Sequence, residues 1–415
     1  MLHARPTLKS LHRQLLPRML HVRFQSSAQV LINKADLHIP SLGTAFPYLW
    51  LRDSCQSPSC VHPSNQQKLH RSSDIPLDIR PDHVESLADG LQIRWSDSHE
   101  SKYTWEFLSR HASPKNLSQF HGDVFKEAWD NATITQAPNL YVSYESIKTP
   151  SGLSTAIDHI CRYGLIFVCG IPNGETSNAT CELRSLAERF SEIRETFYGP
   201  LWDVVNTVNS RNIAYTNLDL GLHMDLLYFQ NPPQYQILHC LRNQVDGGAS
   251  YFVDALLAAE KLKEQNPFYF DVLTSTLVPF HYINDGHHLH FEHPTIELSK
   301  DSKTIIQLNY SPPFQAPLLL STPPVFFSAL REFTRLLNDT RNTYTYTLQE
   351  GDAVLFDNRR VLHARTAFQD KPGVPTEEGE TDRWLKGCYI EADAMWDRGR
   401  VLRSKKKHDC AMKSF

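Results

Sequence analysis

Two potential metal ligands, His223 and Asp225, lie two positions apart, and a third, His363, follows much later in the chain. In an extended segment, side chains at positions i and i+2 leave the same face, so His223 and Asp225 can bind one ion. Two histidines and one carboxylate on one side of an octahedral Fe(II) leave three positions open, which a bidentate 2-oxo acid and O2 can fill. These residue types therefore indicate an iron-dependent oxygenase.

A positively charged side chain, Arg383, begins an apolar segment twenty residues after His363. Its guanidinium can form two parallel hydrogen bonds with the distal carboxylate of 2-oxoglutarate, and Ser250 is a second candidate for that carboxylate. A single His-x-Asp pair, or one arginine, is more often an ordinary surface feature, but the ordered set favours the oxygenase. Two alternatives stay open. A zinc hydrolase would leave Arg383 without a ligand, and the intact set of metal ligands argues against a non-enzymatic scaffold.

The segments that must position these residues are mostly short. Apolar segments bounded by turn residues predict strands, and apolar residues three or four apart predict helices. The mixture favours a mainly β chain with helices, with a jelly roll or antiparallel barrel rather than an alternating parallel fold. Residues 28 to about 122, including 48–52 and 91–95, predict a small β-rich domain. Beyond it, the expected strands are residues 165–171, 235–241, 251–253, 305–310, 343–348 and 353–356, and the expected helices are residues 157–163, 181–193 (with Thr180 as N-cap), 255–263 and 326–337.

Composition and charge exclude several classes of protein. The 415 residues carry a net charge of -4 at pH 7, which does not indicate a positively charged surface for binding nucleic acid. No uninterrupted apolar run approaches the ~20 residues of a membrane span. The eight cysteines are scattered, which argues against a disulfide scaffold and indicates a reducing compartment. A solvated tail explains the basic residues within 404–415.

The first residues differ in composition from the rest. Residues 1–29 contain arginine and lysine but no acidic residue, and Leu8, Leu11 and Leu15 recur at helical spacing. Such a segment is typical of a mitochondrial presequence, so we expect residues 1–27 to be one. Because Pro17 interrupts the apolar stripe, a disordered basic tail on a cytoplasmic protein is the alternative.

Taken together, the chain resembles the γ-butyrobetaine and trimethyllysine dioxygenases of carnitine synthesis, within the wider taurine-dioxygenase-like superfamily. The resemblance runs from about Tyr48 to Arg403, and its most specific segments are residues 48–53, 196–199, 212–216, 237–240 and 355–358 together with His363. It implies Fe(II), 2-oxoglutarate and O2, with ascorbate as reductant. It also implies a double-stranded β-helix catalytic domain (residues 136–403), a small N-terminal domain that carries zinc (residues 28–135) and a homodimer.

The zinc site that the resemblance implies is incomplete in this chain. Family members are similar in holding zinc with a Cys-x-Cys-x-x-Cys loop and a histidine, and here Cys55, Cys60 and His99 stand at three of these positions. Ser57 occupies the fourth, although a neutral serine is a poor zinc ligand. Either His62 or water completes the site, or zinc binds weakly or not at all.

The substrate pocket is also implied by the resemblance. A trimethylammonium group donates no hydrogen bonds, so aromatic faces have to surround it. The aromatic cage positions of the family correspond here to Tyr198, Trp202, Tyr215 and Tyr389, and Asn212 matches a position that binds the substrate carboxylate. The expected reaction is hydroxylation of γ-butyrobetaine to carnitine.

Three departures from the family pattern leave the substrate open. Ser311 stands where the butyrobetaine enzyme has a second carboxylate-binding asparagine, and Met224 and residues 226–228 also differ. A serine is shorter, so the substrate carboxylate is held differently or the substrate is longer. Trimethyllysine and other betaine-like compounds are therefore alternatives to γ-butyrobetaine.

Overall fold

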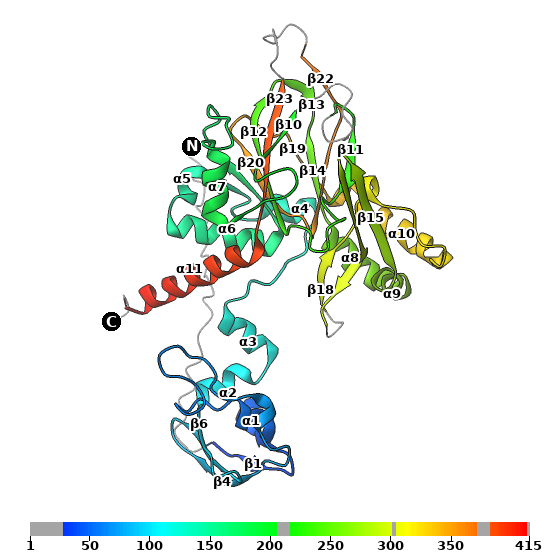
Figure 1. Cartoon of the computed structure of the whole chain (residues 1–415). Helices are drawn as coiled ribbons and strands as arrows, with labels where there is room; N and C mark the ends of the chain where they lie inside the picture. The colour runs from blue at the N-terminus through cyan, green and yellow to red at the C-terminus, as the bar shows by residue number, and fades with distance from the viewer. Residues whose placement is uncertain (1–27, 206–215, 301–303, 372–381, 413–415) are drawn as a thin grey trace, which may run out of the picture. The chain divides into compact units, whose positions relative to one another are not determined.

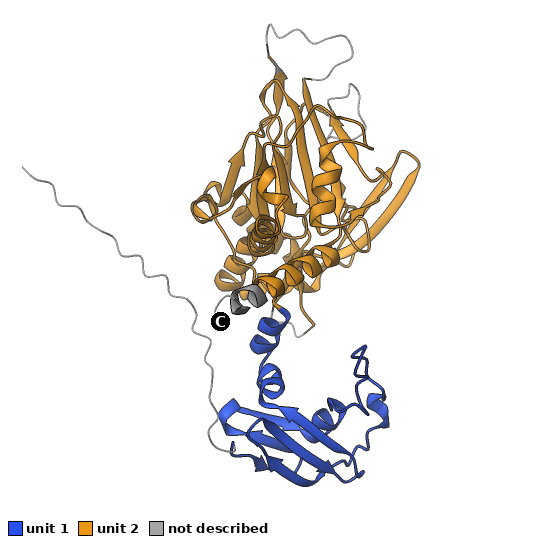
Figure 2. Ribbon diagram, turned by 90° about the vertical axis from the view of Figure 1, so that its left-hand side faces the viewer, with its two compact units in different colours: residues 1–121 blue, residues 122–415 orange. Residues whose placement is uncertain are grey.

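The computed structural model describes residues 28–205, 216–300, 304–371 and 382–412 (Figure 1). The chain divides into two compact units, residues 1–121 and 122–415 (Figure 2). The sequence predicted a domain boundary after residue 135. Helix α4 (Asn131–Gln136) packs against β19 (Thr343–Tyr346), within the second unit. The expected presequence, residues 1–27, lies outside the described residues.

The first unit contains two three-stranded antiparallel sheets. One consists of β1 (Leu31–Ile32), β2 (Asp36–Ile39) and β3 (Thr44–Pro47), and the other of β4 (Pro81–Ser86), β5 (Gly90–Trp95) and β6 (Glu100–Thr104). Alternate residues of β5 point inward, which buries Leu91, Ile93 and Trp95. The helices of this unit are α1 (Tyr48–Asp53), α2 (Trp105–His111), α3 (Pro114–His121) and the 3-10 turns η1 (Pro40–Leu42) and η2 (Ser72–Asp74).

Residues 48–52 are helical, so the prediction of a strand-like segment there was wrong. Helix α1 starts directly after Pro47 and buries Tyr48 and Leu51, which lie three positions apart. A strand would bury residues two positions apart. The helix is less than two turns long and buries two residues. Two apolar positions are too few to distinguish the helical period from the period of two of a strand.

The second unit is organised around two sheets. The larger sheet has the strand order β10 (Trp202–Val205), β23 (Arg383–Ile390), β12 (Tyr235–Asn243), β20 (Ala353–Asp357), β8 (Leu165–Cys169) and β7 (Tyr141–Ser143), and β9 (Ile193–Arg194) also pairs with β23. The smaller sheet has the order β11 (Leu220–His223), β21 (Val361–Arg365), β14 (Ser250–Asp254) and β19. All pairs are antiparallel except β7 with β8.

Strand β8 shows how the sequence produces these layers. Its alternate residues enter two different cores. Leu165 and Phe167 pack with Phe252 and Tyr344 of the smaller sheet. Ile166 and Val168 instead pack with helices α6 (Pro150–Tyr163) and α7 (Glu182–Phe190). A strand covered on both faces is apolar throughout, which explains the uninterrupted run in β8. The mainly β prediction is confirmed, and two packed sheets are consistent with a jelly roll.

The remaining elements cover the sheets. Helix α11 (Ala392–Met412) packs on α6 and includes the first part of the expected basic tail, and α8 (Ala255–Gln265), α9 (Pro267–Ser275) and α10 (Pro324–Leu337) pack together. Helix α7 begins after Cys181, so Thr180 is not its N-cap. Shorter elements are α5 (Tyr144–Ile147), η4 (Pro312–Phe314), η5 (Thr340–Asn342) and three two-stranded ribbons, β13 (Val245–Gly247) with β22 (Phe368–Asp370), β15 (Leu277–Asn284) with β16 (His287–Pro294), and β17 (Ile296–Leu298) with β18 (Ile305–Leu308).

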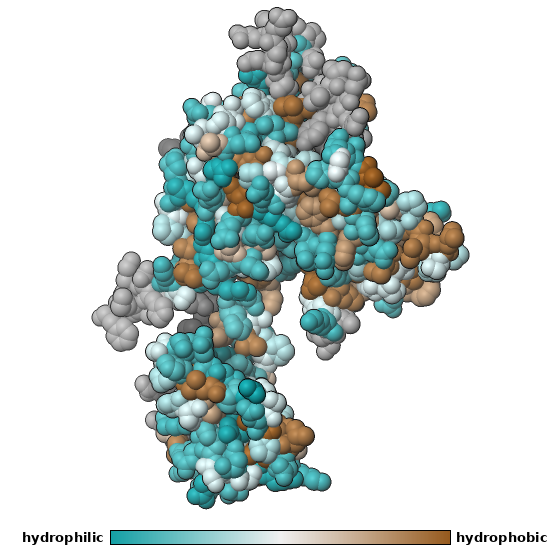
Figure 3. All heavy atoms as spheres, in the orientation of Figure 1, coloured by the Kyte–Doolittle hydropathy of each residue, from teal (hydrophilic) through white to brown (hydrophobic). Residues whose placement is uncertain are grey.

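The surface is mixed in character. On the face seen in Figure 3, hydrophilic residues surround separate apolar patches. None of the described helices combines the length and the apolar composition that a membrane crossing requires.

Candidate active site

The three predicted iron ligands come together at β11, the edge strand of the smaller sheet, and its neighbour β21. His223 ends β11 and pairs across the sheet with His363 of β21, and Asp225 follows two residues later. The His223 Nε2 lies 3.5 Å from Asp225 Oδ1, and the His363 Nε2 lies 3.9 Å from Asp225 Oδ2. One ligand atom from each residue lies within 4.8 Å of the other two. Two imidazoles and one carboxylate that converge in this way fit Fe(II).

Neighbouring groups hold these ligands in place. The His223 Nδ1 lies 2.8 Å from the carbonyl oxygen of Gly221, which directs the other ring nitrogen toward Asp225. Asn358 anchors the backbone of Asp225, because its Oδ1 accepts from the Asp225 N–H at 2.8 Å and its Nδ2 donates to the Asp225 carbonyl at 3.0 Å. The Tyr389 hydroxyl donates to Asp225 Oδ2 at 3.0 Å.

The electrostatics of the site suit a metal. Burial by itself opposes ionisation of Asp225, but interactions with His223 and His363 and the hydrogen bond from Tyr389 outweigh it and lower the pKa of this carboxyl. Burial, reinforced by His223, lowers the pKa of His363 to about 3. Asp225 is therefore ionised and His363 neutral near pH 7, which are the states that bind a metal ion.

A cavity beside these ligands lies between the two sheets. Residues of both sheets contribute to its walls. Arg383 of the larger sheet and Ser250 of the smaller one line it, as the sequence predicted for the 2-oxoglutarate site. Arg383 is 5% exposed, and burial, together with the charge of Arg365, lowers its pKa to about 10. The guanidinium thus keeps its charge at neutral pH.

Two polar residues in the cavity were not predicted. Arg365 lines it and donates to the carbonyl oxygens of Thr216 and Leu218 at 2.7 and 2.6 Å. The signal for Arg365 was available, because it stands two positions after His363 on the same strand. Gln236 of β12 also lines the cavity at 2% exposure, and its Oε1 makes no hydrogen bond with any residue that the structure describes.

Aromatic side chains form the wall next to Asp225. The ring centroids of Trp202 and Tyr389 lie 4.3 Å apart, and those of Tyr198 and Trp202 lie 6.2 Å apart. All three line the cavity, and so does Tyr228, which the sequence did not single out as part of the cage. Two other predicted substrate residues, Asn212 and Tyr215, lie outside the described residues.

Of the three departures from the family pattern, residues 226–228 reach the cavity, because Leu226 and Tyr228 line it. The other two, Ser311 and Met224, are buried. Ser311 is 2% exposed, and its hydroxyl makes no hydrogen bond. Met224 is fully buried in a core shared with Leu227 and Leu256. Neither residue is among those that line the cavity.

Residues 134–389 match the family model described as taurine catabolism dioxygenase TauD, TfdA family. The chain belongs to the TauD/TfdA family of dioxygenases. Residues 17–109 match a second model, gamma-butyrobetaine hydroxylase-like, N-terminal. The resemblance deduced from the sequence motifs is thereby confirmed, and Fe(II), 2-oxoglutarate and O2 are the cofactors that this family implies.

Relatives of three kinds resemble this TauD-family chain along most of its length. Dioxygenase str8 of Strobilurus tenacellus is 59% identical over 369 residues, which cover 88% of this chain and 87% of that protein. The mitochondrial trimethyllysine dioxygenase of Gallus gallus is 30% identical, with coverage of 86% and 83%. The gamma-butyrobetaine dioxygenase of Homo sapiens is 28% identical, with coverage of 87% and 92%.

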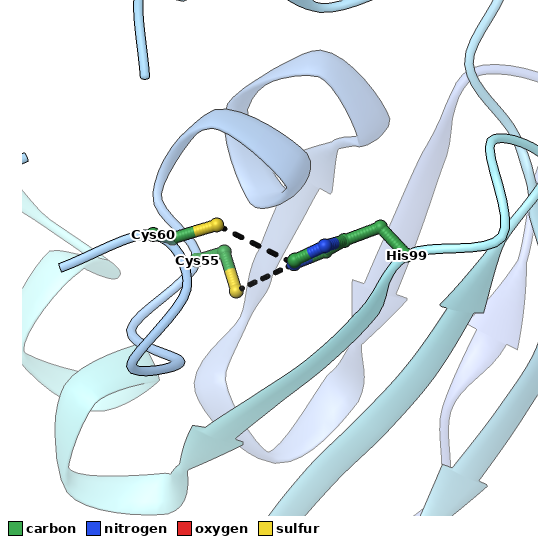
Figure 4. A group of neighbouring side chains, drawn as sticks. All are labelled: Cys55, Cys60 and His99. Carbon is green, nitrogen blue, oxygen red and sulfur yellow. Dashed lines mark hydrogen bonds between the residues drawn. The ribbon is translucent and has the colours of Figure 1, made fainter. Parts of the chain in front are cut away.

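The first unit of this TauD-family chain contains a second cluster of potential metal ligands. The Sγ atoms of Cys55 and Cys60 lie 3.3 and 3.4 Å from His99 Nε2 (Figure 4). Ligands that share a tetrahedral zinc, with bonds of ~2.3 Å to sulfur and ~2.0 Å to nitrogen, stand roughly 3.5 Å apart. Burial is the main cause that raises the pKa of Cys60, so zinc binding has to displace a thiol proton.

The fourth ligand position of this cluster has no strong zinc donor among the described residues. The Ser57 Oγ lies 3.2 Å from Cys55 Sγ, on the cluster. His62, one of the alternatives for this position, is not part of the cluster, and its Nδ1 lies 3.1 Å from Ser64 Oγ. Another histidine of the first unit, His70, does not join the cluster either. Its Nε2 lies 3.4 Å from Asp53 Oδ1, and its two buried ring nitrogens make no hydrogen bond with the described residues. Three strong donors fit zinc, and the fourth nearby donor is a serine hydroxyl.

Proposed function

We propose that this chain hydroxylates a small carboxylic acid that carries a quaternary ammonium group, with γ-butyrobetaine as the first candidate and carnitine as its product. The observation that supports this proposal is the aromatic wall of Tyr198, Trp202 and Tyr389 directly beside Asp225. Aromatic faces attract a cation that cannot donate hydrogen bonds. The substrate carbon to be hydroxylated is thereby held next to the metal ligands.

The cavity residues have separate roles in this proposal. His223, Asp225 and His363 hold Fe(II) on one side. Bound Fe(II), 2-oxoglutarate and O2 supply the oxidation, in which one oxygen atom enters the product hydroxyl, the other enters succinate, and CO2 is released. Arg383 binds the distal carboxylate of 2-oxoglutarate with two hydrogen bonds, and Ser250 contributes to the same site. Because residues of both sheets line the cavity, its walls can fix the position of the substrate relative to the metal ligands.

Tyr389 has two functions in this arrangement. Its hydroxyl donates to Asp225 Oδ2 at 3.0 Å, while its ring packs against Trp202 at a tilt of 31°. The residue thus orients a metal ligand and supplies an aromatic face for the cation. This double use couples the position of the substrate ammonium group to that of the metal.

The family departures leave a second candidate within the same class, although Ser311 itself does not line the cavity. Its short, buried hydroxyl has no partner where the sequence comparison expected an asparagine. Trimethyllysine or another longer betaine would place its carboxylate differently. A zinc hydrolase, by contrast, would leave Arg383 and Arg365 in the cavity without an anion to bind.

The proposal is tested by measuring succinate formation by the purified chain. The assay contains Fe(II), 2-oxoglutarate, ascorbate and one of a panel of compounds, namely γ-butyrobetaine, trimethyllysine, glycine betaine and the neutral tert-butyl isostere of butyrobetaine. We expect coupled succinate formation with a quaternary amine and binding of the isostere about thirtyfold weaker, equivalent to ~2 kcal/mol. Trp202→Leu should remove most of that preference. Equal binding of the cation and its isostere to the wild type would refute the substrate assignment.

A further inference from the structure

A two-stranded ribbon, β15 with β16, lies outside both sheets of the second unit. Its residues alternate between two faces. One face carries Val278, Phe280 and Tyr282, all buried in a core of the unit. The other face carries three histidines that neither the active site nor the zinc-like cluster uses, His281, His288 and His290.

The register of the ribbon places these histidines at neighbouring positions of one face, although their ring nitrogens do not converge as those of the two ligand clusters do. His281 is directly opposite His290 across the two strands. His288 precedes His290 by two positions and therefore projects from the same face, and their ring centroids lie 6.3 Å apart. Glu292 follows His290 by two positions on that face, so a carboxylate flanks the group. His288, His290 and Glu292 are exposed, so their side chains can change rotamer at little cost.

We propose that His281, His288 and His290 form a surface binding site for a divalent late transition metal ion such as Zn²⁺, Cu²⁺ or Ni²⁺. Imidazole nitrogen is a preferred donor for these ions. Side chains directly opposite each other on an antiparallel pair have Cβ atoms only ~5 Å apart, which two imidazoles can bridge through one ion. The third histidine comes from the neighbouring position on the same face, and Glu292 or water completes the coordination.

An ion bound to this ribbon should affect the wall of the catalytic cavity. On the opposite face, Tyr282 stacks on Tyr228 with ring centroids 5.3 Å apart, and Tyr228 lines the catalytic cavity. Tyr282 also lies 6.2 Å from the ring of Phe314, which lines the same cavity. An ion bound to both strands links β15 to β16 and restrains this wall of the cavity. Metal binding should therefore slow amide hydrogen exchange in the ribbon.

The number of bound ions tests the proposal. The untagged full-length protein, with iron and zinc supplied beforehand, is equilibrated with Ni²⁺ by dialysis, and bound nickel is measured. We expect the double variant His288→Gln/His290→Gln to bind one ion fewer than the wild type. His287→Gln is the matched control, because His287 adjoins His288 but lies on the opposite face, with its ring 4.6 Å from Phe197. Equal nickel content of wild type and double variant, or an equal loss in His287→Gln, would overturn the proposal.

Copper spectroscopy tests the third ligand. The electron paramagnetic resonance spectrum of one added equivalent of Cu²⁺ should show coupling to three nitrogens in the wild type and to two in His281→Gln. Identical spectra of these two proteins would exclude the cross-strand site. Slower exchange of β15 and β16 amides on adding Ni²⁺, absent in the double variant, is the readout that a chance surface ligand would not produce.

Discussion

At the scale of single residues, the position of Asp225 depends on groups that do not bind the metal themselves. Asn358 fixes its backbone through two hydrogen bonds, and Tyr389 fixes one carboxylate oxygen. Such partners orient a ligand and maintain its charge. The spacing of the histidines and the aspartate in the sequence contains no information about these partners.

Removing the Tyr389 hydroxyl should weaken iron binding. Tyr389→Phe keeps the ring beside Trp202 but deletes the donor to Asp225 Oδ2. We expect the dissociation constant for Fe(II), measured by anaerobic titration, to rise roughly 10- to 100-fold. Tyr228→Phe is the control, since the Tyr228 ring lines the same cavity. Unchanged iron affinity in Tyr389→Phe would show that Asp225 does not need this hydrogen bond.

Replacing the guanidinium of Arg383 by an amine should weaken the binding of 2-oxoglutarate. Arg383→Lys keeps the charge but offers no planar pair of donors, so one charge-assisted hydrogen bond to 2-oxoglutarate is lost. At ~1.5 to 3 kcal/mol for such a bond, KM for 2-oxoglutarate should rise at least about tenfold. Steady-state kinetics check this value, with Arg94→Lys, an exposed position in the first unit, as control. An unaltered KM would place the 2-oxoglutarate carboxylate elsewhere in the cavity.

At the scale of elements, the sequence predicted best where burial is strong and regular. Strands β12, β20 and β23 appeared as apolar segments because both of their faces are covered. The iron ligands, which lie on the smaller sheet or directly after its strand β11, could be predicted because few residue types bind iron. The aromatic residues required the family resemblance, since a single buried tyrosine is usually only a core residue.

Other elements were missed for identifiable reasons. The β15 and β16 ribbon has histidines on its outer face, which concealed the period of two formed by Val278, Phe280 and Tyr282. Helix α4 is short, and its membership of the second unit follows from tertiary contacts with β19 rather than from its composition. Local patterns cannot predict such contacts.

Gly387 should prove essential for the position of Trp202. The two residues are paired across β10 and β23, and a Cβ on Gly387 would lie 2.6 Å from Trp202 Cε2. Gly387→Ala must therefore displace the indole from the cavity wall. We expect KM for the quaternary ammonium substrate to rise by about tenfold, the equivalent of a lost cation–π contact, and KM for 2-oxoglutarate to change little.

Gly174→Ala is the matched control for this substitution, because a Cβ at that position meets no atom within 4 Å. Kinetics of both variants with the substrate found in the succinate assay provide the comparison. If Gly387→Ala and Gly174→Ala have the same KM, the indole of Trp202 does not contact the substrate.

The loop from Cys55 to Cys60 permits a gain-of-function test. Ser57→Cys replaces the hydroxyl that lies 3.2 Å from Cys55 Sγ with a thiol. If the cluster binds zinc, four strong donors should raise zinc affinity by at least about tenfold, because thiolate is a far better zinc ligand than neutral serine. Competition with a chromogenic chelator measures this affinity. Equal zinc affinity of the variant and the wild type would remove Ser57 from the coordination sphere.

At the scale of the whole molecule, the two units have separate hydrophobic cores, so they can respond separately to conditions. The core of the first unit includes Trp95, Tyr103 and Leu51, and adjoins the cysteine cluster. The second unit contains the catalytic cavity and the buried histidines. A homodimer and mitochondrial import stay predictions, the latter because residues 1–27 lie outside the described part of the chain.

Three buried imidazoles should make the second unit sensitive to acid. Burial is the main cause that lowers the pKa of His159, His239 and His293, each to about 4. In the unfolded chain a histidine titrates near pH ~6.5. Between pH ~6.5 and ~4 the unfolded state therefore binds more protons than the folded state, and the free energy of unfolding falls as the pH decreases through this window. Above it, both states are neutral and these groups cause no pH dependence.

His239 is the most direct test, because it is fully buried and neither of its ring nitrogens makes a hydrogen bond. His239→Leu removes the titrating group without leaving a partner unsatisfied. The free energy of unfolding is measured by guanidinium denaturation at pH 7 and at pH 5, in the presence of a chelator. Each such histidine should contribute about 2 kcal/mol to the decrease between the two pH values. We expect a correspondingly smaller loss for His239→Leu, whereas the exposed control His288→Gln should behave like the wild type. The same loss in His239→Leu and the wild type would mean that His239 already carries its proton in the folded chain at pH 5.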